Sequence, residues 1–295
     1  MALKKSIISR VQRESEQWHD TRAPLLAKIG AHFKKNVVVF QTSFMFDNGL
    51  IEDADATMLE EVLLSSKIRN NLLLIVNSAG GFGLAAERII RVCRKYSVNG
   101  FEALVPHMAK SAATIICFGS KRIWMGETSE LGPVDPQLRI GKRYVSVYNI
   151  LKSYDALLVK ASKAKGNIDP YLHQLSVYDP RDMAQLRQEM DLSEAMSVQL
   201  LKSGMMRGKS EARIRKCIQM FIDPQKTLEH GRPLFWEDSK KCGIAVDKIG
   251  VDKPIWEVIW ELQLRYDGIM GRFGKVVESV DDSFSLPGHF HHKDD

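Results

Sequence analysis

Long apolar runs are absent from this sequence of 295 residues. No stretch approaches the roughly 20 consecutive apolar residues that a membrane-spanning helix needs. Residues 1–18 begin basic and then turn polar, so they lack the apolar centre of a signal peptide. We therefore expect no integral membrane segment.

Cysteine is scarce as well. The chain has four cysteines, and no two of them form a Cys-x-x-Cys pair, the spacing common in zinc and redox motifs. This pattern predicts reduced, structural cysteines in a cytoplasmic protein. The histidines His289, His291 and His292 stand in a polar tail, which is weak evidence for a metal site. We predict neither a metal nor any other cofactor.

Charge of one sign does not dominate the chain. The 42 basic and 36 acidic residues leave a net charge of +6, and the basic residues are scattered singly or in pairs such as Lys34 and Lys35. Nucleic-acid-binding surfaces gather basic and aromatic side chains into a stripe, and none is seen here. We expect no nucleic-acid partner. Hydrophobic residues make up 44% of the chain, enough for an ordinary globular core.

The first half of the chain alternates strand-like and helix-like segments. Apolar and β-branched runs predict buried strands at 36–44, 72–77, 101–106 and 122–125. Helical patterns occupy 54–66, 84–96 and 111–119. Buried strands that alternate with helices are typical of a parallel sheet covered on both faces. The predicted fold class is α/β, a parallel sheet with flanking helices and a helical C-terminal part.

The segments on either side of this half complete the predicted organisation. Residues 1–32 predict an N-terminal amphipathic helix, and residues 33–282 form one domain. Within that domain we expect later helices at 147–164, 181–205, 208–221 and 255–266, and a late strand at 243–249. The polar residues 283–295 predict a disordered tail.

Two strand ends carry the residues that suggest chemistry. Asn77-Ser78-Ala79-Gly80-Gly81 follows one predicted strand, and Lys110-Ser111-Ala112-Ala113 opens a helix after the next. Glycines after a strand let a backbone N–H approach a substrate oxygen closely. A serine at a helix N-terminus lies beside unpaired N–H groups and the positive end of the helix dipole. Either piece alone is usually a turn or a helix cap, but their ordered combination fits acyl transfer.

These motifs resemble those of the serine dehydrogenase proteinase family, in the Clp-protease/crotonase superfamily, similar to signal peptide peptidase A. The resemblance runs from about Asn36 to Val251, and its most specific part is VPHMAKSAATIICFGSKRIWMGETSELGPVDPQ. It implies that Ser111 is the nucleophile and that the backbone N–H groups of Gly81 and Ala112 form the oxyanion hole. It also implies a peptide or protein substrate and a homo-oligomer.

The general base is the open part of this assignment. Clp-type peptidases place a histidine after the Leu-Gly-like segment, but Val134-Asp135-Pro136-Gln137 contains none. Relatives of signal peptide peptidase use a lysine from a later helix, which burial can make basic enough. Lys152 lies in the more apolar helix and is the first choice, with Lys163 as the alternative; a solvated surface lysine is the competing interpretation.

Other polar residues near these motifs receive structural interpretations. We expect Lys110 to point away from the reacting centre, His107 to anchor its loop, His230 to bind backbone and Asp135 to orient a turn.

The sequence thus predicts an ATP-independent serine endopeptidase that uses a Ser111–Lys152 dyad. Two alternatives stay open. One is an inactive scaffold of the same fold. The other is a crotonase-type acyl-CoA hydratase or isomerase, which needs a glutamate base that the motifs do not supply.

Overall fold

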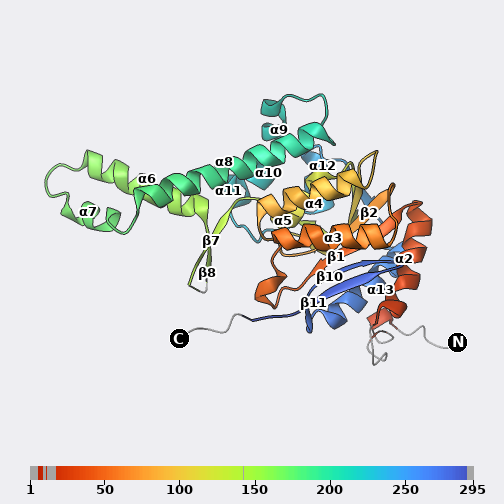
Figure 1. The fold of residues 1–295 in the computed structure, drawn as a ribbon. Helices are drawn as coiled ribbons and strands as arrows, with labels where there is room; N and C mark the ends of the chain where they lie inside the picture. Colours follow the sequence, from red (N-terminus) through yellow and green to blue (C-terminus); the bar gives the residue numbers. More distant parts are fainter. Residues whose placement is uncertain (1–5, 9–10, 12–17, 142, 291–295) are drawn as a thin grey trace.

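A seven-stranded sheet forms the centre of the computed structural model, which describes residues 6–8, 11, 18–141 and 143–290 (Figure 1). The strand order is β11-β10-β1-β2-β3-β5-β9. The five strands from β1 to β9 run parallel, and β10 and β11 are added antiparallel at one edge. Their bounds are β1 Asn36–Thr42, β2 Leu72–Asn77, β3 Glu102–Val105, β5 Ile123–Gly126, β9 Val246–Ile249, β10 Phe273–Ser279 and β11 Ser283–Pro287.

The strands are buried because helices cover both faces of the sheet. Alternate residues point to opposite faces, so Val38 and Phe40 join one apolar cluster while Val37 and Val39 join the other. The first cluster lies under α3 (Asp53–Ser65), α4 (Gly83–Lys95) and α5 (Ala112–Gly119), and the second lies under α2 (His19–Phe33) and α13 (Pro254–Ile269). The predicted α/β class, with a mostly parallel sheet and flanking helices, is confirmed.

A helical arm projects from this body (Figure 1). The hairpin of β7 (Gln137–Ile140) and β8 (Arg143–Ser146) leads into α6 (Val147–Lys163) and α7 (Asp169–Leu175), and α8 (Pro180–Ser203) returns to the body. The arm has its own small apolar cluster, which includes Val147 and Leu186. The chain returns to the sheet through α9 (Glu211–Cys217), α10 (Gln219–Ile222), α11 (Pro224–Thr227) and α12 (Trp236–Lys241).

The two antiparallel strands were not expected from the sequence. The prediction of a disordered tail is wrong for its first residues, because Ser283–Pro287 pairs with β10 as β11. Beyond it, the backbone N–H of His289 donates to Asn48 at 3.0 Å, and the Phe290 ring packs on Phe46 with centroids 4.8 Å apart. The last five positions lie outside the described residues.

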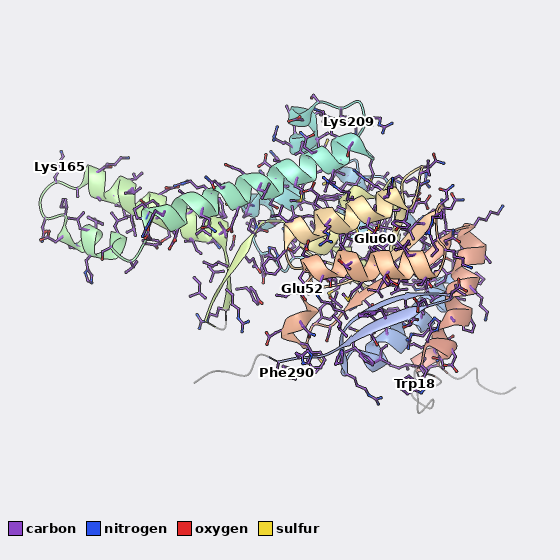
Figure 2. All side chains as sticks on the ribbon, in the orientation of Figure 1. Trp18, Glu52, Glu60, Lys165, Lys209 and Phe290 are labelled. Atoms are coloured by element: carbon purple, nitrogen blue, oxygen red, sulfur yellow. The ribbon has the colours of Figure 1, made fainter. Side chains whose placement is uncertain are left out.

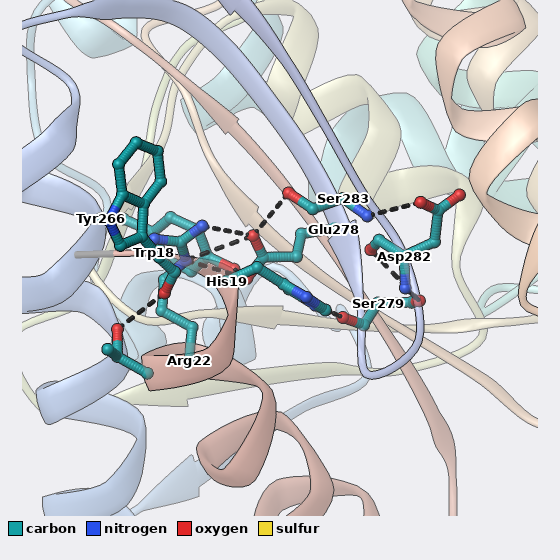
Figure 3. A network of polar contacts seen from close by, with 9 residues as sticks. Trp18, His19, Arg22, Tyr266, Glu278, Ser279, Asp282 and Ser283 are labelled. Atoms are coloured by element: carbon teal, nitrogen blue, oxygen red, sulfur yellow. Dashed lines mark hydrogen bonds and ion pairs between the residues drawn. The ribbon is translucent and has the colours of Figure 1, made fainter. Parts of the chain in front are cut away.

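A buried polar network joins β10 to the N-terminal helix (Figure 3). The carboxylate of Glu278 accepts from Arg22 Nε at 2.9 Å, from the Tyr266 hydroxyl at 2.9 Å and from Ser283 Oγ at 2.8 Å. Burial raises the pKa of Tyr266 well above its usual value, and the charge of Glu278 adds to that shift. The network thus fixes α2 and α13 to the edge of the sheet.

The predicted N-terminal helix is observed from His19 onward; most of the positions before it lie outside the described residues. Leu26 and Ile29 bury its apolar side on the core. Among the helices that the structure describes, none is both long enough and apolar enough to cross a bilayer.

Candidate active site

Short backbone pairings bring four distant segments together beyond the carboxyl ends of the strands. Ser78 bridges Ala109, β4 (Met108–Ala109) pairs with β6 (Glu130–Leu131), and Leu131 bridges Leu234. These contacts align Ser78, Ala109, Leu131 and Leu234 in one row. The residues that follow Ser78, Ala109 and Leu131, and those that precede Leu234, therefore extend to the same side of that row. In parallel α/β proteins, this edge of the sheet is where ligands bind.

Ser111, two residues after Ala109 in this row, has a strained backbone conformation. Its φ is 49° and its ψ is −120°, and helix α5 begins at the next residue. A non-glycine residue in such a region costs of order 1–3 kcal/mol and occurs mainly at functional sites. Its side chain does not cap the helix, and no described residue is hydrogen-bonded to its Oγ. The Ser111 hydroxyl is thus available at the positive end of α5.

Gly80 lies against this serine, and Gly81 lies against the backbone of Ile51. A Cβ on Gly80 would be 2.7 Å from the Cβ of Ser111, and a Cβ on Gly81 would be 2.2 Å from the backbone N of Ile51. Gly80 also has a φ of +109°, which side chains rarely adopt. Glycine at position 80 therefore lets the loop after β2 approach Ser111 this closely, and glycine at position 81 lets the same loop pair with Ile51.

The backbone N–H groups of Gly81 and Ala112 are among those in this region that have no acceptor within the described part of the chain. Hydrogen bonds on either side hold the Gly81 peptide, since Ile51 N donates to Gly80 O at 2.9 Å and Phe82 N donates to Ile51 O at 2.8 Å. Unpaired N–H groups near a buried surface usually find a ligand or water. Both N–H groups can therefore donate to a bound ligand or to water.

The structure does not bring either candidate lysine into contact with Ser111. Lys152 is exposed on α6, where its amine lies 5.5 Å from the centre of the Tyr148 ring. Lys163 is the last residue of α6, close to Lys165, which marks the outer end of the arm in Figure 2. Neither lysine is recorded in a hydrogen bond or ion pair with another described residue.

Two neighbours of Ser111 point elsewhere. The amine of Lys110 forms an ion pair with Glu130 at 2.9 Å, so it supports β6. The backbone oxygen of His107 accepts a hydrogen bond from the backbone N–H of Glu130 at 2.8 Å, and its ring lies near Asp267 of α13. Burial raises the pKa of Asp267, and the charge of His107 opposes that shift. Lys110 and His107 therefore make contacts that support the local structure, as expected from the sequence.

A histidine–carboxylate pair lies on the same side of the four-segment row. Nδ1 of His230 is 2.9 Å from Oδ1 of Asp135, and Ser146 Oγ donates to Oδ2 of Asp135 at 3.1 Å. The Asp135 side chain is 4% exposed and that of His230 is 16% exposed. A carboxylate only accepts, so the pair places the proton on Nδ1 and leaves the lone pair of the neutral ring on Nε2.

Contacts of Lys110 link this pair to the segment that carries Ser111. Its amine lies 3.4 Å from the backbone oxygen of Gly231, the residue after His230. Thr114 of α5 also exchanges hydrogen bonds of 3.0 Å with both backbone groups of Gly132, three residues before Asp135. The segments that carry His230 and Asp135 therefore pack against the segment that carries Ser111.

No group of three or more His, Cys, Asp and Glu side chains is arranged as a metal site within the described ranges. Burial raises the pKa of the Cys117 thiol in α5 to about 12, so that thiol stays protonated and unreactive.

The fold and this arrangement define a ClpP-like α/β protein. A family model of ClpP-like SDH-type serine proteinases matches residues 28–272, and the chain belongs to that family. Two uncharacterized proteins of Methanocaldococcus jannaschii are also similar to it. MJ0137 is 40% identical and MJ1495 is 32% identical, each over 65 residues. The match spans 22% of this chain and 22% of the length of each relative.

The sequence did not reveal the pairing of His230 with Asp135. The two residues are 95 positions apart, and the bridge of Leu131 to Leu234 brings their segments together. The one available signal was that both lie inside motifs that resemble the family.

Proposed function

We propose that this protein is an ATP-independent serine endopeptidase with Ser111 as its nucleophile. The observation that carries the proposal is the strained Ser111 at the start of α5, held beside the unpaired N–H groups of Gly81 and Ala112. Ser111 Oγ attacks the peptide carbonyl, and these two N–H groups stabilise the oxyanion. The C–N bond then breaks, and the general base passes the serine proton to the leaving amine. Water hydrolyses the acyl-enzyme, which releases the second product and restores Ser111.

Two residues are candidates for the general base. The sequence proposes Lys152, by resemblance to relatives that use a Ser-Lys dyad. The contacts around the site favour His230, because Asp135 orients its ring and leaves Nε2 able to accept the serine proton. In this second arrangement Asp135 stabilises the imidazolium ion that forms when the proton is transferred.

The first experiment replaces the nucleophile. We expect Ser111→Ala to abolish hydrolysis of a denatured protein substrate and labelling by a fluorophosphonate probe. The urea concentration at which half of the protein is unfolded should stay close to the wild-type value, as it does for a substitution at the surface. Hydrolysis that survives in purified Ser111→Ala protein would refute the proposal. Labelling of Ser111 without hydrolysis of any peptide would instead favour another acyl-transfer activity on this fold.

The second experiment separates the bases. If His230 is the base, His230→Gln lowers kcat by about 10³ or more and Lys152→Met leaves it near the wild-type value. If Lys152 is the base, the two results are exchanged. Both variants are compared at equal fluorophosphonate concentration, which reports nucleophile reactivity directly.

The resemblance also proposes a homo-oligomer. In support, the arm exposes apolar side chains far from the sheet, among them Leu172 and Val177, the second of which is 77% exposed. Native mass spectrometry of the full chain tests this; a strictly monomeric species at micromolar concentration would contradict it.

A further inference from the structure

Building on the proposed function, we propose that Lys275 is a positioning residue for the oxyanion site: its ion pairs with Asp55 and Glu52 hold the backbone N–H of Gly81 in place. Lys275 lies in β10, outside the segment that the family model covers.

Lys275 is a fully buried cation. Its side chain is 1% exposed, and its amine lies 2.6 Å from Glu52 Oε1 and 2.7 Å from Asp55 Oδ1. Lysine is almost never buried to this degree unless it is paired. Removal of one partner of a buried pair leaves an uncompensated charge. The surrounding structure must then move so that water can solvate that charge. The position of the two carboxylates therefore depends on Lys275.

Those two carboxylates begin helix α3. Glu52 is its N-cap residue, and the backbone N–H of Glu52 donates to Asp55 Oδ2 at 2.8 Å. The Asp55 side chain is 0% exposed. Burial raises the pKa of its carboxyl above the usual value, and the charge of Lys275 opposes this shift. The cation of β10 is thus what favours an ionised Asp55 at the start of α3.

Ile51, the residue before this cap, holds the loop that contains Gly81 through backbone hydrogen bonds. Ile51 is fully buried, and it hydrogen-bonds the peptide groups on both sides of Gly81, through Gly80 O and Phe82 N. The backbone of Ile51 lies so close to Gly81 that a Cβ there would overlap its N and O atoms. Any shift of Ile51 therefore moves the Gly81 N–H. One path from Lys275 to that N–H therefore passes through the α3 cap and this bridge.

Strand β10 also supplies a matched control. Glu278, three residues after Lys275, is equally buried and equally paired, but it faces α2 and α13 (Figure 3). Its partners Arg22, Tyr266 and Ser283 lie outside residues 51–82. A variant at Glu278 removes a buried charge from the same strand and leaves the α3 cap in place.

The expected effect falls on the transition state. A misplaced oxyanion donor weakens binding of the tetrahedral intermediate, while binding of the extended substrate is unchanged. We expect Lys275→Met to lower kcat by about 10- to 100-fold with KM changed less than about threefold. A peptide boronate forms a tetrahedral adduct with a serine nucleophile, so its Ki rises by the same factor as kcat falls. A purely structural role would lower the amount of active enzyme and leave the boronate Ki unchanged.

The test compares Lys275→Met with Glu278→Gln in the full chain, after active-site titration with a fluorophosphonate. The proposal expects a reduced kcat and weakened boronate binding in Lys275→Met only. Equal kcat and Ki in the two variants would overturn it. If Lys275→Met does not fold, Glu52→Gln replaces it, because the Glu52 side chain is 45% exposed and tolerates the change; the expected loss is then about threefold in kcat. Wild-type protein that neither hydrolyses peptide nor reacts with the fluorophosphonate would refute the proposed function itself.

Discussion

A Cβ added to Gly80 would lie 2.7 Å from the Cβ of Ser111, closer than such atoms approach in proteins. The contact ties the loop after β2 to the start of α5, two segments that also meet through the bridge of Ser78 to Ala109. The geometry of the candidate site is therefore sensitive to a single methyl group.

Gly80→Ala should accordingly lower reactivity toward a fluorophosphonate by about 10². The methyl group must displace Ser111 or Lys110, and alanine is also strained at a φ of +109°. Gly208→Ala is the matched control, because Gly208 has a φ of +86° but nothing within 4 Å of its added Cβ. The rate of probe labelling is measured for both. Equal rates would show that backbone strain, not contact with Ser111, limits the reaction.

Asp135→Asn tests the orientation of His230 separately from its removal. Asparagine keeps the shape, but its amide can donate to Nδ1 and so favours the tautomer with the proton on Nε2. We expect kcat to fall by about 10³ to 10⁴ with little change in KM. Ser146→Ala, which removes only the contact to Oδ2, should have a smaller effect. Full activity in Asp135→Asn would contradict this prediction and would favour Lys152 over His230 as the general base.

The buried carboxylate of Glu102 should make the fold sensitive to acid. Burial alone raises its pKa, but the hydrogen bond from Trp124 and the charges of Lys35 and Lys121 outweigh burial, and the net pKa is lowered from 4.5. Because the folded pKa lies below the unfolded one, its stabilisation is full above the unfolded value and is lost as pH falls through the folded value. We expect Glu102→Gln to cost about 1–2 kcal/mol at neutral pH.

Urea unfolding at several pH values checks this prediction. The difference between Glu102→Gln and wild type should shrink as pH falls below 4.5, because the unfolded carboxylate takes up its proton there and the folded one does so only at lower pH. Glu127→Gln is the control, since Glu127 pairs with Lys248 at 3.0 Å but is 39% exposed. A Glu102 effect that stays constant with pH would contradict the assignment.

The network around Glu278 should contribute to stability without affecting catalysis. Tyr266→Phe removes one hydrogen bond to a buried carboxylate and should cost about 1–3 kcal/mol. Arg22→Met leaves that carboxylate without its cation and should cost about 3–5 kcal/mol. Thermal unfolding measures both. Loss of peptidase activity per folded molecule in either variant would show that this edge of the sheet communicates with the site.

The sequence predicted the parallel core well because its strands are continuous apolar runs. Leu72–Asn77 was placed without error, and Ser111 was correctly assigned to the start of a helix. These features depend on local patterns, since a buried parallel strand is apolar throughout and a helix start follows a strand end. The assignment of the chain to its family rested on the same segments and is confirmed.

Strand β10 was missed because buried charges break its pattern. Phe273–Ser279 contains Lys275 and Glu278, and side chains of these two types are usually exposed at the surface. Their partners lie 220 and 256 positions away, so the residues close to them in the sequence do not predict the pairing. The same limit applies to His230 and Asp135. Long-range ion pairs are set by topology, which residue periodicity does not encode.

The late position of β10 also bears on biosynthesis. Synthesis reaches Ser111 long before Lys275, so a chain on the ribosome has its nucleophile and both glycines but no cation for the α3 cap. Such a chain also lacks the antiparallel neighbour of β1. Under the proposed function, a nascent molecule therefore has its complete oxyanion site, and can cleave peptides, only after β10 has been synthesised.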